Sequence, residues 1–247
     1  MEILTLKSKD KLGCDTCNKC CIYRGDIRLT PINVCEISEF LSISINEFIN
    51  KYTDRLEKDL FELVLKTRGE HKECILYNQE TYKCLIHPVK PMQCVMFPLY
   101  PENIKNDLFI NSGQCKKDSY PEIKVENWLN GNNEIYKKHR DFCIYWISFI
   151  EDIQSVVKRK DLYSQLDINK IYKILFENYT ESKLLSSYEK QARKNIEDVK
   201  KIVRELLKKP TLKWSRFLFY IRVLSIYSIS FLLRFNLKSS PKNLKNL

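Results

Sequence analysis

The chain has 247 residues, of which 44% are hydrophobic and 30% charged, a composition that supplies a buried core and excludes an intrinsically disordered protein. Its N-terminus, MEILTLKSKDKLG, has lysines where a secretion signal needs an apolar run, so we expect a cytoplasmic protein. The net charge of +11 lies wholly in residues 126–247, whereas all but one of the ten cysteines precede residue 125. This joint change predicts a cysteine-rich domain over residues 1–125 and a basic helical domain over residues 126–247.

Two short helices are predicted near the N-terminus. The first begins after Thr30, an N-cap residue followed by proline at the first helical position. Its apolar stripe consists of Val34, Ile37, Phe40 and Leu41, with Cys35 beside it. The second begins at Ser44, where the sequence Ser-Ile-Asn-Glu matches a capping box. Its buried face consists of Phe48, Ile49 and Tyr52.

Short strands follow these helices. The stretch LFELVLKTRG at 60–69 alternates as a strand does, and residues 74–86 predict a hairpin with cysteines at its ends. Residues 107–110 predict one more strand. Such a region has little core of its own, so we expect bound metal to hold it together.

The second half is predicted to be helical. Helices are expected over residues 142–158 and from Asp167, an N-cap, to about residue 178. In residues 183–209 apolar side chains recur every three or four positions, and Pro210 ends the helix. The members of this seam are Leu185, Tyr188, Ala192, Ile196, Val199, Val203 and Leu206. The predicted fold class is therefore α+β, mainly α, with a small metal-stapled N-terminal region and a helical C-terminal half.

An apolar run at 217–233, interrupted only by Arg222, has two interpretations. It is slightly short for a membrane span and fits the central helix of a bundle. Basic residues on both sides make an anionic membrane surface, reached through residues 211–245, a second candidate partner beside an unknown protein. The basic run within 200–209 predicts a solvated helix face, so we do not expect nucleic acid as a partner.

The stretch CDTCNKCC at 14–21 carries the most specific signal. The C-x2-C-x2-C spacing of Cys14, Cys17 and Cys20 lets one loop direct three sulfurs to a common point, as in the ligation of a [4Fe–4S] cluster. A zinc site accepts the same spacing when other cysteines complete it. Thiols of a cytoplasmic protein stay reduced, which favours metal ligation over disulfides. Spacing alone leaves the choice between Zn²⁺ and an iron–sulfur cluster open.

The remaining ligands are expected from later cysteines. Cys20 and the adjacent Cys21 point apart in extended backbone and so indicate two sites or one larger cluster. The predicted ligand set is Cys14, Cys17, Cys20, Cys21, Cys74, Cys84, Cys94 and Cys115. Cys35 and Cys143 lie in apolar helical patterns and are expected to be buried structural thiols. His87 fits either a ligand or a loop histidine.

These cysteines resemble those of the YkgJ-type cysteine-cluster family, a zinc- or iron-chelating domain with a CxxCxxCC signature. The resemblance covers residues 14 to about 116 and includes CLIHPVKPMQCVMFP at 84–98. It departs from the family at Val95, where arginine is common, and at Asn33, where aspartate is common. It implies metal or iron–sulfur binding, and some proteins with a similar cluster methylate flagellin lysines. The two departures favour a site that holds metal without the full activity.

The sequence thus supports three hypotheses. The first is a metal-binding protein with an iron–sulfur cluster, of the [4Fe–4S] type, or Zn²⁺ in a redox or structural role. The second, permitted by the resemblance, is a group-transfer enzyme of the methyltransferase type, for which no catalytic base or cofactor loop is visible. The third is a membrane-attached electron carrier. Whether the protein is an enzyme stays open.

Overall fold

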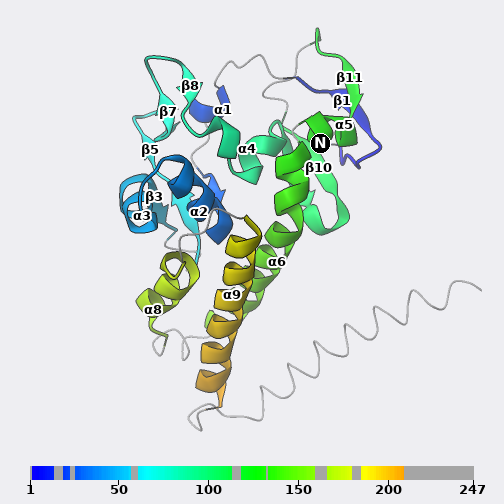
Figure 1. The fold of residues 1–247 in the computed structure, drawn as a ribbon. Helices are drawn as coiled ribbons and strands as arrows, with labels where there is room; N and C mark the ends of the chain where they lie inside the picture. Colours follow the sequence, from blue (N-terminus) through cyan, green and yellow to red (C-terminus); the bar gives the residue numbers. More distant parts are fainter. Residues whose placement is uncertain are drawn as a thin grey trace, which may run out of the picture. The chain divides into compact units, whose positions relative to one another are not determined.

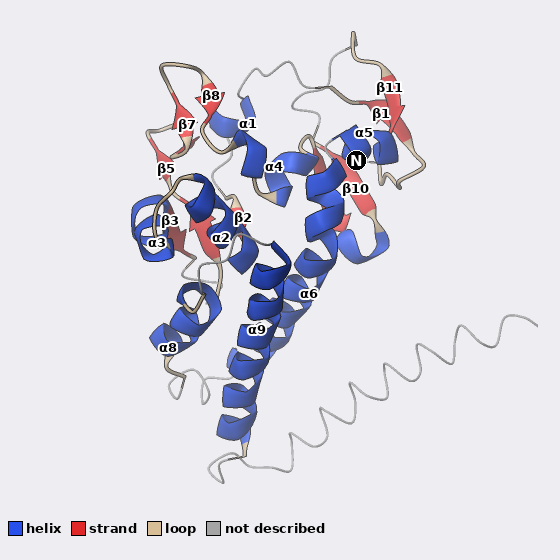
Figure 2. Ribbon diagram, viewed as in Figure 1, coloured by secondary structure: helices blue, strands red, loops and turns tan. Residues whose placement is uncertain are grey.

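Helices dominate a mixed α+β structure, which confirms the expected α+β, mainly α class, whereas the metal stapling of the N-terminal region stays a prediction (Figures 1 and 2). The computed structural model describes residues 2–13, 19–22, 26–56, 61–112, 118–131, 133–158, 166–179 and 185–208. Residues Met1–Ile202 form one compact unit and Val203–Leu247 a second. The apolar run at 217–233 and its basic flanks lie outside the described residues.

In the described ranges the strands are short and pair antiparallel in five small sheets. Three of the four two-stranded sheets join strands that follow one another in the chain: β5 (Thr67–Arg68) with β6 (Glu73–Cys74), β7 (Tyr77–Asn78) with β8 (Lys83–Cys84), and β9 (Leu99–Asn103) with β10 (Leu108–Asn111). Two sheets join distant segments: β1 (Lys9–Lys11) with β11 (Glu122–Lys124), and β4 (Leu63–Leu65) between β2 (Arg28–Leu29) and β3 (Thr53–Arg55).

These strands refine the sequence-based expectations. The strand predicted at 60–69 is two strands, β4 and β5, in different sheets. The predicted hairpin exists as β7 and β8, in which Cys84 lies opposite Tyr77. Its other end was placed wrongly, because Cys74 belongs to β6 and lies opposite Thr67 of β5. Cys74 and Cys84 are therefore the last strand residues of two separate hairpins, each built from two-residue strands.

Two helices of the first half begin where the sequence predicted. In α2 (Pro31–Phe40) the hydroxyl of Thr30 accepts from the Asn33 N–H, and the Asn33 Oδ1 accepts from the Thr30 N–H. Phe40 was wrongly assigned to the apolar stripe, since it is 44% exposed. In α3 (Ile45–Tyr52) the Ser44 hydroxyl caps the helix, and Phe48 is fully buried. The sequence missed the short α1 (Lys19–Ile22) and α4 (Met92–Met96).

The second half contains the two longest described helices, α6 (Asn133–Val157) and α9 (Leu185–Leu207). It also contains the shorter α5 (Val125–Gly131) and α8 (Ile168–Tyr172), which has a π-helical continuation η3 (Lys173–Glu177). The Asp167 side chain caps α8 through the Lys170 N–H, as predicted. The α9 seam is confirmed at five positions, because Tyr188, Ala192, Ile196, Val199 and Val203 are buried, whereas Leu206 is only half-buried.

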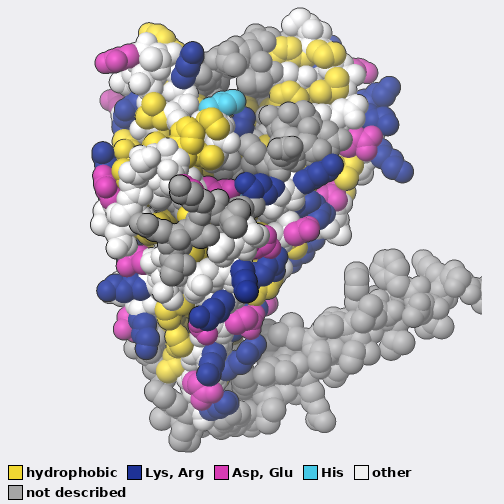
Figure 3. All heavy atoms as spheres, in the orientation of Figure 1, with side chains coloured by type: hydrophobic (Ala, Val, Ile, Leu, Met, Phe, Trp, Pro, Cys, Tyr) yellow, Lys and Arg dark blue, Asp and Glu magenta, His cyan; other side chains and the backbone are white. Residues whose placement is uncertain are grey.

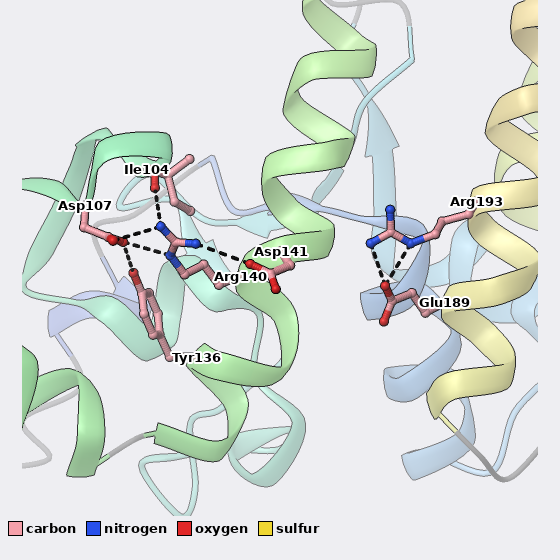
Figure 4. A network of polar contacts seen from close by, with 7 residues as sticks. All are labelled: Ile104, Asp107, Tyr136, Arg140, Asp141, Glu189 and Arg193. Carbon is pink, nitrogen blue, oxygen red and sulfur yellow. Dashed lines mark hydrogen bonds and ion pairs between the residues drawn. The ribbon is translucent and has the colours of Figure 1, made fainter. Parts of the chain in front are cut away.

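A polar network fixes α6 against the turn between β9 and β10 (Figure 4). Asp107 ends the short 3-10 helix η2 (Ile104–Asn106) in the left-handed region, with φ of 50°. Its carboxylate accepts two hydrogen bonds from Arg140, each 2.8 Å long, and one from the Tyr136 hydroxyl at 3.1 Å. Burial, followed by the charge of Asp107, raises the pKa of Tyr136 to about 12, so this phenol stays a donor.

A second link joins α2 to α6. The Glu36 carboxylate contacts His139 Nε2 at 3.1 Å and Lys138 Nζ at 3.0 Å. The hydrophobic core likewise draws on both halves: it includes Leu4, Leu12, Val95, Leu99, Phe109, Val125, Leu129 and Cys143. The domain boundary expected near residue 125 stays a prediction.

The surface of α9 matches the expected solvated helix face. Lys200 pairs with Glu197, and Lys208 pairs with Glu205, each at 2.8 Å. On the face shown in Figure 3, basic and acidic side chains are interspersed. Within the described ranges, no helix combines the length and the apolar character that crossing a bilayer requires.

Candidate metal centre

Five of the predicted ligands lie in the described part of the chain, and all five are half-buried. Cys20 and Cys21 lie on α1, Cys74 on β6, Cys84 on β8 and Cys94 on α4. The other three predicted ligands, Cys14, Cys17 and Cys115, lie outside the described residues. The structure confirms that Cys35 and Cys143 are buried thiols, with exposed fractions of 1% and 7%.

The thiol of Cys21 connects two distant segments. It shares hydrogen bonds with the side chains of Cys20 and Cys84, so that α1 meets the β7–β8 hairpin at sulfur atoms. In Figure 1, α1 lies next to this hairpin. Cys74 lies near enough to Cys84 and Cys20 for their charges to raise its pKa. Four thiols from three elements therefore gather in one place.

Backbone N–H groups point at two of these sulfurs. The Leu76 N–H bonds to Cys74, and the Ile86 N–H bonds to Cys84, in each case from two residues further along the chain. Leu76 and Ile86 are themselves buried, with exposed fractions of 0% and 1%, which fixes both turns. An N–H donor stabilises a thiolate more than a neutral thiol. The two turns that follow β6 and β8 are thus preorganised to hold negatively charged sulfur.

The pKa values of these thiols differ. The hydrogen bond from Cys21, together with the Ile86 N–H and the Lys90 charge, outweighs burial and lowers the pKa of Cys84 to about 7. The hydrogen bonds to Cys20 and Cys84 raise the pKa of Cys21. Burial raises the pKa of Cys74 to about 11. Cys84 therefore loses its proton more readily than Cys21 or Cys74, and Cys21 donates a hydrogen bond to it.

Two cations lie beside the thiols. Arg68 on β5 contacts Glu73 at 3.4 Å and donates to the Tyr77 carbonyl, and its charge partly offsets the rise that burial causes in the pKa of Cys74. Lys90 acts in the same direction on Cys84. Positive charge next to thiolates offsets the accumulation of negative charge that several ligating sulfurs produce. The sequence suggested Lys90 for this role but not Arg68.

His87 lies at the exposed start of a 3-10 turn, η1 (His87–Val89). Partial burial and the charge of Lys90 lower its pKa. This position fits the loop-histidine interpretation. The two departures from the family pattern have structural roles, because Val95 is buried in the core and Asn33 completes the cap of α2.

The donor set fits a soft metal. All seven described cysteines are thiols rather than disulfides, and thiolates are the ligands of structural zinc and of iron–sulfur clusters. Among the described residues alone, no three His, Cys, Asp or Glu side chains are arranged to hold a metal ion. The predicted set of eight metal ligands therefore stays a prediction, three of whose members lie outside the described residues.

Comparison with known proteins agrees with this chemistry. No solved structure matches the chain. A family model described as "CxxCxxCC: Putative zinc- or iron-chelating domain" matches residues 13–143. The match spans more than half of the chain and contains all eight predicted ligands, and its description supports metal binding in general. The chain therefore belongs to the CxxCxxCC family.

Proposed function

We propose that the protein binds an iron–sulfur cluster, of the [4Fe–4S] type, or Zn²⁺ through its clustered cysteines. The proposed ligands are Cys14, Cys17, Cys20, Cys21, Cys74, Cys84, Cys94 and Cys115. The observation that carries the proposal is the meeting of Cys20, Cys21 and Cys84 through shared hydrogen bonds. Cys14 and Cys17 directly precede these thiols in the sequence and are the proposed source of further sulfurs.

The N–H···S turns support ligation over a merely structural cluster of thiols. A neutral buried thiol is a weak hydrogen-bonding group and does not need an aligned backbone donor. A thiolate bound to a metal does benefit from such donors, which stabilise its charge and tune the site. Two such donors, at Leu76 and Ile86, fit the second situation.

The role we propose for the metal is first structural. Residues 66–90 hold two hairpins of two-residue strands, and their buried hydrophobic side chains are Leu76, Tyr77 and Ile86. Hairpins this short are not stable in water alone. Thiolate–metal bonds supply folding free energy that so small a core lacks.

Metal analysis of the full chain, purified without oxygen, tests the proposal. We expect at least about one equivalent of zinc, or several of iron, per chain. Cys84→Ser should lower this metal content at least severalfold, because it removes the thiol whose lowered pKa favours ligation. Cys143→Ala is the matched control and should keep the metal, because that thiol belongs to the core. Less than about half an equivalent of iron plus zinc in the unmodified chain would refute the proposal.

Optical spectra then separate the two metals. An iron–sulfur cluster gives broad visible absorption that dithionite bleaches, whereas zinc is colourless and redox-inert. Bleaching that reverses in air would assign a redox role to the cluster. A colourless protein with bound zinc would assign a structural role.

A further inference from the structure

A cavity of about 390 Å³ lies among β2, α2, α4, η2 and α6. Its walls are mostly apolar and include Leu29, Met92, Met96, Ile104, Trp146 and Ile150. None of the five proposed metal ligands in the described part of the chain lines it. This volume is near the lower end of the range for small-molecule sites in proteins.

Two buried hydrogen-bond donors line this cavity. Asn33 and Trp146 are each 3% exposed. The Asn33 Oδ1 accepts from the backbone N–H and the hydroxyl of Thr30, both at 3.1 Å. No described residue accepts from its Nδ2 amide hydrogens. The Trp146 ring packs against Phe149 and Phe176, and its indole N–H likewise has no acceptor in the described part of the chain.

Buried donors of this kind call for an explanation. Buried polar side-chain atoms nearly always have a hydrogen-bond partner, and the indole N–H of a buried tryptophan usually finds one. Two such donors at the wall of one apolar cavity therefore indicate an acceptor that enters the cavity with a ligand.

The charges at the cavity restrict that ligand. Three charged residues line it, and each contacts an opposite charge: Arg28 pairs with Glu62 at 2.6 Å, and Glu151 pairs with Lys105 at 3.2 Å. A charged ligand would lose its hydration in the cavity, and the charged side chains of the wall that could offset this loss are already paired with one another or with Lys105. The Cys143 thiol in the wall is also neutral, since burial raises its pKa to about 12. The site thus favours an uncharged molecule held without a covalent bond.

We propose that this cavity binds a small, uncharged, mainly apolar molecule with a carbonyl oxygen that accepts hydrogen bonds from Asn33 and Trp146. The apolar walls bind the body of the ligand, and the two donors fix its orientation. This site is distinct from the thiol cluster and does not depend on which metal the cluster holds.

A pair of matched probes tests the role of the carbonyl. 2-Acetylnaphthalene and 2-ethylnaphthalene have similar shapes and differ in the carbonyl oxygen. Dissociation constants are measured by calorimetry on the full chain in its metal-loaded form. We expect the ketone to bind at least about fivefold tighter, as one net hydrogen bond predicts. The anion 2-naphthoate should bind at least about tenfold more weakly than the ketone.

Three variants connect this preference to the two donors. Trp146→Phe removes the indole N–H and keeps an aromatic wall, and Asn33→Asp removes the amide hydrogens and keeps the oxygen that caps α2. Each should reduce the preference for the ketone to about twofold or less. Trp128→Phe is the control and should leave the preference unchanged, because Trp128 lies outside the cavity wall.

The hydrocarbon probe reports whether the cavity of a variant is intact, so a loss of folding is distinguished from a loss of the donor. The proposal is overturned if neither naphthalene binds to the unmodified chain, or if the two bind equally. It is also overturned if the preference for the ketone survives both donor substitutions.

Discussion

At the scale of single residues, two hydrogen bonds of 2.8 Å from Arg140 to Asp107 link α6 to the turn between β9 and β10 (Figure 4). Both side chains are 24% exposed, so solvent screens the pair only in part. Arg140→Leu removes both hydrogen bonds from Arg140 to Asp107 and leaves Asp107 with the hydrogen bond from the Tyr136 hydroxyl. We expect the free energy of unfolding to fall by about 2 kcal/mol, because hydrogen bonds between charged groups contribute more than neutral ones. Urea unfolding followed by circular dichroism measures this loss.

Arg193 provides a matched comparison for this experiment. It pairs with Glu189 one helical turn away at 2.7 Å, and the two side chains are 40% and 31% exposed. Its guanidinium also lies 4.6 Å from the centre of the Tyr145 ring. Arg193→Leu should therefore cost at most about 1 kcal/mol. An equal or larger loss than for Arg140→Leu would contradict this ranking of the two pairs.

The Glu36 carboxylate predicts a stability difference that depends on pH. Burial alone would raise its pKa, but the hydrogen bonds and charges of His139 and Lys138 outweigh burial and lower the pKa. A lowered pKa means that the folded state binds this proton less readily than the unfolded state. The stabilisation is therefore complete above the unfolded pKa, near 4.5, and is lost as the pH falls through the folded value.

Comparison with Glu36→Gln measures this contribution. At pH 6 we expect the variant to be less stable by about 1–2 kcal/mol, since a buried charged hydrogen bond is lost. Below about pH 4.5 the difference should shrink, because the native carboxylate also becomes neutral. Both proteins are unfolded in urea in the metal-free form, since acid also protonates thiolate ligands. A difference that grows as the pH falls would have the wrong sign for this assignment.

The sequence predicted which residues meet at the candidate site better than it predicted how they are arranged. The spacing of Cys14, Cys17 and Cys20 pointed to ligation, and the structure brings Cys20 and Cys21 to Cys84. The N–H···S turns were not predicted, because they depend on backbone conformation. A usable signal exists in the two similar stretches Cys-Ile-Leu at 74–76 and Cys-Leu-Ile at 84–86, where the third residue is buried in both.

At the scale of elements, helix caps are the features that the sequence predicts most reliably, and α3 offers a clean test. The Ser44 hydroxyl accepts from the Glu47 N–H at 3.1 Å and is exposed, so its substitution changes little besides the cap. Ser44→Ala should lower the free energy of unfolding by about 1 kcal/mol. Ser44→Asp keeps an acceptor and should stay within about 0.5 kcal/mol of the unmodified chain. Equal losses in both variants would show that the cap does not stabilise this helix.

Element length explains the successes and the failures of prediction. The sequence predicted α2, α3, α8 and α9, because each of them has either a cap or a long apolar seam. Helices α1 and α4 have four and five residues, too few for a helical period to emerge. The β5–β8 strands have two residues each, so alternation could reveal a hairpin but not its partner strands. The register of Cys74 therefore required the structure.

At the scale of the whole molecule, the first compact unit combines two kinds of stability. Helices α6 and α9 contribute many fully buried side chains, such as Phe142, Phe149, Ala192 and Ile196. Residues 66–90 contribute few, and expose Tyr82 and Leu85 by 67% and 47%. Regions with few buried contacts open at lower free energy than the core does. Metal at the thiols should therefore stabilise the hairpins locally and the helices very little.

Hydrogen exchange followed by mass spectrometry tests this division of stability. Removal of metal by a chelator should speed amide exchange in residues 66–90 at least about tenfold, because the short hairpins lose the bonds that hold them. Exchange in residues 142–153 of α6 should stay within about twofold, since packing in the core protects those amides. Cys84→Ser should give fast exchange in 66–90 without a chelator, and Cys143→Ala should not. Equal protection of the hairpins with and without metal would mean that their fold is independent of the thiol site.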